Sequence, residues 1–295
     1  MNRKIDYKIN ENDTGKTVEG FLKEHGYTHQ VLVRLKQTDH GILRNGIWAY
    51  TNERLCKDDL ITVQIVENEC SDNIAPVNLP LDIVYEDDDI IVINKPFDMP
   101  AHPSAGNHDN TLANALMYYY GSQNKPFVYR CINRLDRDTT GLTIVAKHAL
   151  AGGILGNAVA KRAIHRTYYA VCSGCTPACM RISAPIARKD ASTIERCVDF
   201  KRGENAVTDF IRIKYNPDNN LSLVKLRLLT GRTHQIRVHM KYIGFPLIGD
   251  FLYNPDYTYI SRQALHSGRL VFTHPVTGQK MNLISDIPSD MKSLF

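Results

Sequence analysis

The chain has 295 residues, enough to bury more than one core, and its 43% apolar and 23% charged residues are ordinary for a globular protein. It contains no apolar run long enough to cross a bilayer, so we expect no membrane-spanning helix. The N-terminal stretch MNRKIDYKINEND lacks the apolar segment expected of a secretory signal. We therefore expect a cytoplasmic protein whose seven cysteines are reduced thiols.

The net charge of +5 is unevenly distributed. Residues 1–79 carry 10 basic and 12 acidic side chains, so the other residues, with 26 basic and 19 acidic side chains, carry +7. Basic residues concentrate in 130–170 and in 225–241, beside polar motifs. This clustering favours a polyanionic partner, above all nucleic acid, although charge alone leaves open a moderately basic enzyme without such a partner.

The first seventy residues predict a small module of two helices followed by a short sheet. Apolar spacing predicts one helix ending near His25 and Gly26, a second helix, a strand and turn at 41–46, and a closing strand at 60–66. The helices present Val18, Phe21, Leu22, Val31, Leu32 and Leu35. The segments ILRNG and KDDLITVQI make residues 1–70 resemble the alpha-L RNA-binding module of ribosomal proteins. Because the stretch is not basic, a structural appendage is an equal interpretation.

Residues 71–80 are polar, contain two prolines and predict a linker. Apolar runs at 83–85 and 90–93 then flank an acidic turn, which predicts a hairpin. Asn110 is placed to cap a helix. The apolar face of that helix consists of Leu112, Ala115, Leu116 and Tyr119.

The stretch CINRLDRDTTGLTIVAK, residues 131–147, combines a crowded set of charges with a buried strand. Its second half is rich in branched apolar residues and predicts that strand. Before it come Arg134, Asp136, Arg137 and Asp138 and a Thr-Thr-Gly turn. An acid between two arginines at the mouth of a buried strand should remain ionised. The alternative is a solvated loop with paired surface charges.

The remaining chain predicts a helix near 149–163 and strands at 166–171, 224–228, 265–273 and 279–285. In the second of these strands Lys225 and Arg227 alternate with apolar residues, so one face is buried and the other basic. A turn at Gly231 then leads into a helix with Arg237 and Lys241 four residues apart.

Four segments, in order, look like the motifs of the RluA-type pseudouridine synthases. NRLDRDTTGLTIVAK resembles the family signature, IVYEDDDIIVINKP with AHPS its first motif, and RTYYAVCSG its basic-x-Tyr strand. LLTGRTHQIRVHMKYIGFPLIGD, followed by RQALHSGRLVFTHPVTG, resembles its third motif. The likeness is colinear over residues 80–285.

This resemblance implies an α+β fold, in which residues 81–295 form a catalytic domain with a bent, mainly antiparallel mixed sheet, flanking helices and a central cleft for RNA. It implies that a uridine in RNA loses its N-glycosidic bond and that the uracil turns and reattaches through carbon. It implies neither a metal nor an organic cofactor. We expect large-subunit (23S) ribosomal RNA as the substrate, with transfer RNA as the second choice, and a monomeric enzyme.

The resemblance also assigns roles. Asp136 matches the catalytic aspartate, which attacks the ribose or the base or assists elimination, and a carboxylate is suited to this when ionised and oriented. Tyr168 matches the tyrosine that helps to remove the ring proton and can stack on a flipped base. Arg237 matches the arginine that pairs with the aspartate. Asn133 stands where the family has His, and we expect altered contact to RNA or to the loop with activity retained.

The expected substrate contacts form a wider group. Phosphate contacts are expected from Lys225, Arg227, Arg232 and Lys241, with solvated surface positions as the alternative. Further substrate-binding candidates are Arg134, Arg137, His234 and Gln235.

Three other interpretations remain at this point. Residues 136–140 also fit the D-x-D-x-T pattern of aspartyl-phosphate phosphohydrolases, but no hydrophobic strand directly precedes the first Asp. Cys172, Cys175 and Cys179 have a spacing that could hold a metal cluster, but a fourth ligand is not evident, which favours incidental thiols. A catalytically inactive RNA-binding protein or ribosome assembly factor would not require Asp136, Tyr168 and Arg237 together.

Overall fold

The computed structural model describes residues 1–190 and 194–295, and its first 66 residues form a small sheet covered by two helices. The sheet is antiparallel in the order β1-β4-β2-β3. Its elements are β1 (Asn2–Lys8), the 3-10 turn η1 (Glu11–Asp13), α1 (Val18–Glu24), α2 (His29–Gln37), β2 (Ile42–Arg44), β3 (Ile47–Trp48) and β4 (Leu60–Val66). Asn45 and Gly46 have φ values of 54° and 83° and make the predicted two-residue turn.

The sequence patterns missed β1, which carries charged residues and buries only Ile5. The two helices and β4 are confirmed, and the predicted apolar residues of both helices lie in one core with Ile61 and Val63 of β4. The apolar spacing of residues 1–66 therefore predicts their fold, except for β1, which is held by its pairing with β4.

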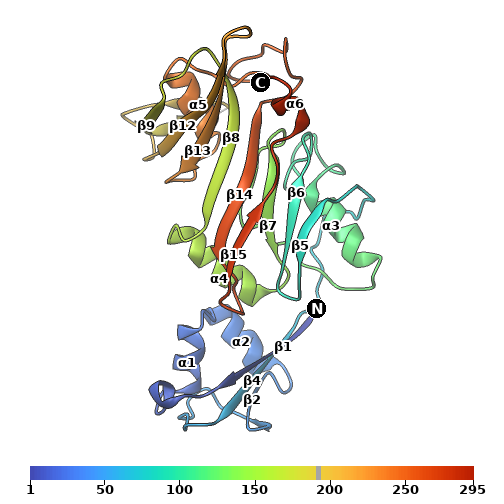
Figure 1. Cartoon of the computed structure of the whole chain (residues 1–295). Coiled ribbons are helices and arrows are strands. Elements are labelled where there is room, and N and C mark those ends of the chain that lie inside the picture. The colour runs from blue at the N-terminus through green and yellow to red at the C-terminus, as the bar shows by residue number, and fades with distance from the viewer. Residues whose placement is uncertain (191–193) are drawn as a thin grey trace.

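A nine-stranded mixed sheet dominates the rest of the molecule (Figure 1). Its order is β5-β6-β7-β14-β8-β13-β12-β9, with β15 also paired to β14. The strands are β5 (Ile83–Glu86), β6 (Ile90–Lys95), β7 (Thr140–Ala146), β8 (His165–Ser173), β9 (Cys179–Ser183), β12 (Val207–Asn216), β13 (Leu221–Leu228), β14 (Leu265–Thr273) and β15 (Lys280–Ile284). A separate pair consists of β10 (Ile186–Arg188) and β11 (Arg196–Val198). All pairings in the large sheet are antiparallel except β7 with β14, which confirms the expected mainly antiparallel mixed sheet.

Two parts of β14 pair with different strands. His266 and Ser267 pair with β7, whereas Arg269 to Thr273 pair with β15, and the pairing with β8 shifts register between these two parts. Gly141 has φ 110°, and a Cβ there would clash with the backbone of Ser267. This close approach brings the end of the charged loop before β7 directly against β14.

Four further helices flank the sheet: α3 (Leu112–Gly121), α4 (Ala149–Ala160), α5 (Gln235–Tyr242) and α6 (Ser289–Lys292). The prediction that Asn110 caps α3 is wrong. Thr111 is the N-cap, and its hydroxyl and the Asn114 side chain form a capping box. No helix in the described ranges is both long and apolar enough to span a membrane.

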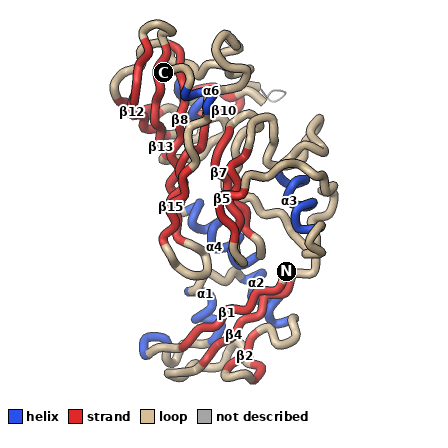
Figure 2. The backbone as a smooth tube through the Cα atoms, turned by 45° about the vertical axis from the view of Figure 1, so that its right-hand side comes forward, coloured by secondary structure: helices blue, strands red, loops and turns tan. Residues whose placement is uncertain are grey.

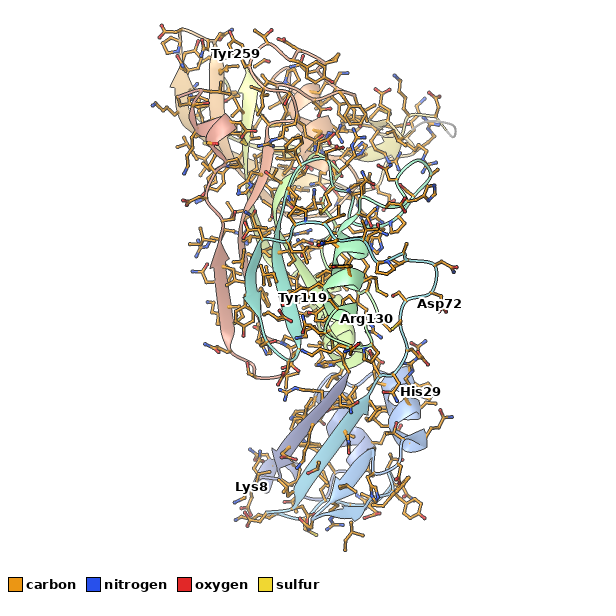
Figure 3. The ribbon with its side chains drawn as sticks, turned by 90° about the vertical axis from the view of Figure 1, so that its right-hand side faces the viewer. Lys8, His29, Asp72, Tyr119, Arg130 and Tyr259 are labelled. Carbon is orange, nitrogen blue, oxygen red and sulfur yellow. The ribbon has the colours of Figure 1, made fainter. Side chains whose placement is uncertain are left out.

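The N-terminal module packs against the first turns of α4, and Figure 2 shows α4 between the module and the central sheet. Leu150 of α4 belongs to the core of the module. Glu67 accepts a hydrogen bond from the backbone N–H of Ala149 at 2.8 Å and pairs with Arg130 at 2.9 Å. Figure 3 shows Arg130 at this junction. The contacts join the module to the helix that leads toward the cavity described next.

Candidate active site

A cavity of about 1060 Å³ opens where the loop before β7, the start of β8, the loop after β13 and α5 meet. Asp136, Tyr168 and Arg237 all line it, although they come from three separate elements. The structure therefore brings together the three residues that the motifs singled out. The loop 100–104, which contains the AHPS motif, lines the same cavity.

Asn133 attaches the charged loop to β7. Its side chain is buried, its Nδ2 donates to the carbonyl of Leu142 at 3.1 Å, and its Oδ1 accepts from the N–H of Ile144 at 2.8 Å. These bonds are to β7 rather than to the loop itself, and Asn133 also lines the cavity, so the altered contact to RNA stays a prediction.

Lys95 supports the same loop from the interior of the domain. Its fully buried ammonium donates to the carbonyls of Arg137 at 2.8 Å and Pro96 at 2.7 Å. Burial lowers the pKa of Lys95 to about 7, although the nearby carboxylates of Asp138 and Asp136 act in the opposite direction. The backbone of the charged loop is thus fixed by a group that has no access to solvent.

Asp136 pairs with Arg237 and not with its neighbours in sequence. Arg237 Nη1 donates to Asp136 Oδ2 at 3.0 Å, and the Asp136 side chain is 29% exposed. The flanking arginines do not bind this acid, because Arg137 pairs with Asp138 at 3.1 Å and Arg134 makes no ion pair in the described part of the chain. Asp136 Oδ1 has no hydrogen-bond partner among residues 1–190 and 194–295. Asp136 as a whole lines the cavity.

Arg237 is held on every side. Its Nε and Nη2 each donate to the carboxylate of Asp250 at 2.7 Å, and its guanidinium lies 5.3 Å from the Phe251 ring centre and 4.9 Å from that of Tyr253. Burial alone would lower the pKa of Arg237, but the bonds to Asp250 and the charge of Asp136 raise it above its ordinary value. Arg237 is therefore a permanent cation in the wall.

His234 precedes α5 in a left-handed conformation with φ 56°. Its Nδ1 lies 3.0 Å from the hydroxyl of Tyr253, and its Nε2 lies 3.9 Å from Asp136 Oδ2. Burial lowers the pKa of His234 although the charge of Asp136 acts in the opposite direction, and burial therefore favours the neutral ring.

Tyr168 lies on β8 opposite Ser267 of β14 and Leu226 of β13. Its side chain is 4% exposed, yet it lines the cavity. Its hydroxyl has no hydrogen-bond partner within the described ranges. A buried ring with a free hydroxyl can both support a base and exchange a hydrogen bond with it.

The other predicted contacts divide into two sets. Arg134, Arg137, Arg227, Arg232 and His234 line the cavity, with Arg232 also paired to Glu204. Lys225 and Lys241 are exposed outside its lining, and Lys241 lies 5.5 Å from the ring centre of Tyr253.

Gln235 also lines the cavity, but its side-chain amide is bonded within the protein. Its side chain is 2% exposed, its Oε1 accepts from Thr230 and from the N–H of Arg232, and its Nε2 donates to Thr208. It fixes the loop that carries the Gly-Arg-Thr turn, where direct contact with a substrate would require these bonds to break.

Sequence reasoning missed Arg162, between α4 and β8, and Arg166, the second residue of β8, which both line the cavity. The signal was available for Arg166, because it precedes Tyr168 by two residues and shares its side of the strand. For Arg162, the only signal in the sequence was its position in the basic stretch 130–170.

One group of potential metal ligands lies elsewhere: Asp87, Asp89 and His274, beside the module. His274 Nδ1 accepts from the backbone N–H groups of Val276 and Thr277. The neutral ring must then carry its proton on Nε2, which faces Asp87 at 2.8 Å. Arg3 already neutralises Asp89 at 2.7 Å. The group is therefore better suited to internal ion pairing than to a metal.

The three clustered cysteines form no such group among the described residues. Cys172 is buried within β8, whereas Cys175 and Cys179 are exposed. Cys175 accepts from Arg212 Nη1 at 2.7 Å. These positions agree with incidental thiols.

A family model described as RNA pseudouridylate synthase matches residues 89–242, more than half of the chain. The chain belongs to the RNA pseudouridylate synthase family, as its motifs indicated, and is thus an isomerase that acts on RNA.

Two curated relatives illustrate the likeness. The "Uncharacterized RNA pseudouridine synthase YjbO" of Bacillus subtilis is 38% identical over 95% of this chain and 98% of its own length. The "Ribosomal large subunit pseudouridine synthase D" of Haemophilus influenzae is 42% identical over 78% of this chain and 75% of its own length. Among solved structures, "Human RNA Pseudouridylate Synthase Domain Containing 1" matches with a TM-score of 0.59 and 26% identity, over 70% of this chain and 83% of that one.

Proposed function

We propose that this enzyme converts specific uridines of structured ribosomal RNA to pseudouridine with Asp136 as its catalytic carboxylate. The bond between N1 of uracil and C1′ of ribose breaks, and a bond between C5 and C1′ forms. C5 loses a proton and N1 gains one, so the reaction is balanced without an external reactant. The observation that carries the proposal is the half-bonded Asp136, which lines the cavity and has one oxygen held by Arg237 and the other unpaired among the described residues.

Each of the three residues has a role that fits its surroundings. Asp136 acts through its unpaired oxygen, on the ribose or the base, or by assisting elimination. Arg237 holds the other oxygen and fixes the plane of the carboxylate. Tyr168 supports the flipped uracil with its ring and takes part in removal of the C5 proton through its free hydroxyl.

The charge of the cavity supports an RNA substrate. Its described lining contains seven arginines, no lysine and one carboxylate, that of Asp136. The arginines are Arg134, Arg137, Arg162, Arg166, Arg227, Arg232 and Arg237. Guanidinium groups bind phosphates with two parallel hydrogen bonds and stack on bases, which suits a folded RNA strand. We assign the phosphate contacts to the lining arginines that face solvent and a peripheral role to Lys225 and Lys241.

The choice of ribosomal RNA rests on relatives such as that of Haemophilus influenzae, whose name specifies the large ribosomal subunit. Transfer RNA is the second candidate substrate. An enzyme with this substrate would act in the cytoplasm, and the enclosed position of the trio within one chain favours a monomer.

The test compares pseudouridine maps of total RNA from cells that lack this gene and from cells that express the wild type or Asp136→Ala. Because isomerisation leaves mass unchanged, the RNA is first treated with a reagent selective for pseudouridine. We expect discrete sites in ribosomal RNA to return with the wild type and not with Asp136→Ala. Asp209→Ala, which removes a carboxylate paired with Arg181 outside the cavity, is the matched control and should restore them. An active Asp136→Ala enzyme would contradict the catalytic assignment, and loss of no site at all would favour an RNA-binding role.

A further inference from the structure

Asp250 is a fully buried carboxylate that the proposed chemistry does not use. It lies just beyond α5 and receives both the Nε and the Nη2 hydrogen bonds of Arg237. A buried charge needs compensation, and this pairing supplies it. The same pairing also fixes which nitrogen of Arg237 donates to Asp136, and this orientation matters for catalysis.

We infer that Asp250 is a positioning residue, which holds Arg237 so that only Nη1 reaches Asp136 and one oxygen of Asp136 stays free for the uridine. The inference rests on the proposed function of Asp136. The contact between Arg237 and Asp136 is a single hydrogen bond of 3.0 Å to Oδ2. A guanidinium released from Asp250 could instead turn its two-donor edge to Asp136 and occupy both oxygens.

The charges lead to the same conclusion. Arg237 lies between two carboxylates, so the three groups together carry one negative charge. Asp250 has no exposure to solvent, whereas Asp136 is 29% exposed. The remaining negative charge is therefore available at the cavity, where a covalent or electrostatic catalyst needs it.

The turn that follows Asp250 completes the support. Asp250 Oδ1 also accepts the backbone N–H groups of Leu252 and Tyr253, at 3.1 and 3.2 Å. Because the turn is tight, it places the rings of Phe251 and Tyr253 against the guanidinium. Asp250 thus binds the edge of the Arg237 guanidinium and positions the rings that lie against its faces.

The first experiment measures RNA affinity and the single-turnover rate at saturating RNA for Asp250→Asn. Asn keeps the size of the side chain and an oxygen for the turn but removes its charge. We expect the rate to fall roughly 100-fold, the scale of loss from a misplaced catalytic group, with the RNA dissociation constant changed less than about twofold. Asp209→Asn weakens another two-bond arginine pair, that with Arg181 at 2.7 and 2.8 Å, and should leave both values unchanged.

A second experiment tests whether Asp250 acts through Arg237. It compares a double variant with Arg237→Gln and does not require Asp250→Asn to fold by itself. The variant Arg237→Gln/Asp250→Asn removes both buried charges together and should fold. If Asp250 acts through Arg237, the double variant is as fast as Arg237→Gln alone. A further loss in the double variant, or a wild-type rate in Asp250→Asn when Asp136→Ala is inactive, would overturn the inference. Activity in Asp136→Ala would instead count against the proposed function.

Discussion

At the scale of single residues, the site depends on groups that are held from inside the protein. Asp136 is oriented by Arg237, which is oriented by Asp250, while the backbone next to Asp136 is held by Lys95. Of these side chains, only that of Asp136 is partly exposed. The Asp136 carboxylate is therefore held in place although it lies on a loop.

Lys95 provides a test of this internal support through its pH dependence. In the folded protein its pKa is about 7, whereas in the unfolded chain it has the ordinary value of about 10.4. Between these values the unfolded chain binds one more proton, so a rise in pH favours the folded state. We expect wild type to gain stability relative to Lys95→Met as pH rises from about 7 to about 10.

The measurement is urea unfolding of both proteins at several pH values. Met fills a similar volume without a titrating group, so the difference between the two proteins isolates Lys95. A difference that stays constant across this range would show that the ammonium is not stripped of its proton in the folded protein.

At the scale of elements, α4 connects the module to the cavity. Its first turn contacts the module through Leu150, and the chain beyond its last turn carries Arg162 before β8 and Arg166 within β8. A Cβ on Gly231 would lie 3.3 Å from Arg166 Nη2, so this guanidinium lies beside the loop after β13, which also lines the cavity. Neither arginine has an ion-pair partner in the described part of the chain.

We expect Arg162→Gln and Arg166→Gln each to weaken RNA binding and to reduce the slope of log affinity against log salt by about one. The reason is that each unpaired guanidinium can neutralise one phosphate. The rate at saturating RNA should change little. Binding titrations at four or more salt concentrations measure the slope, with Arg181→Gln, an ion-paired arginine outside the cavity, as control. An unchanged slope would remove these residues from the binding surface.

At the scale of the whole molecule, we propose the division into a module at 1–70, a linker at 71–80 and a catalytic domain at 81–295. The linker is tied down, because the N–H groups of Ser71 and Val77 donate to the carbonyls of Phe127 and Asn114. The module is joined to the catalytic part by ion pairs of Arg3 and Glu67 and by shared apolar packing. These contacts favour the structural interpretation of the module, with the RNA-binding interpretation still to be tested.

Leu150→Ala tests this connection. Removing a buried leucine side chain should lower the free energy of unfolding by about 2–5 kcal/mol. Because Leu150 packs in the core of the module, we expect faster amide hydrogen exchange in α1 and α2 as well as in α4. Leu155→Ala removes a leucine from the opposite, sheet-facing side of α4 and should leave the exchange of α1 and α2 unchanged. Equal effects of both variants on the module would contradict a local connection through Leu150.

Local patterns predicted most of the regular structure. The apolar spacing located α1, α2 and most strands of the large sheet, because the buried faces of these elements have regular periods. It missed β1, β9 and β12, whose outward residues are charged or whose exposed face is apolar, as at Ile211 and Ile213. Such strands are held by pairing with neighbours that the local sequence does not reveal.

The sequence by itself determined the family, the class of reaction and the three residues to seek in one cavity, because its motifs are short, colinear and chemically specific. Only the tertiary structure decided which arginines face that cavity, that Gln235 is buried and that Asp250 holds Arg237. The physical reason is distance along the chain. Arg237 and Asp136 are 101 residues apart, and the contacts at such separations depend on strand order, register and burial together. No local pattern of side chains contains that information.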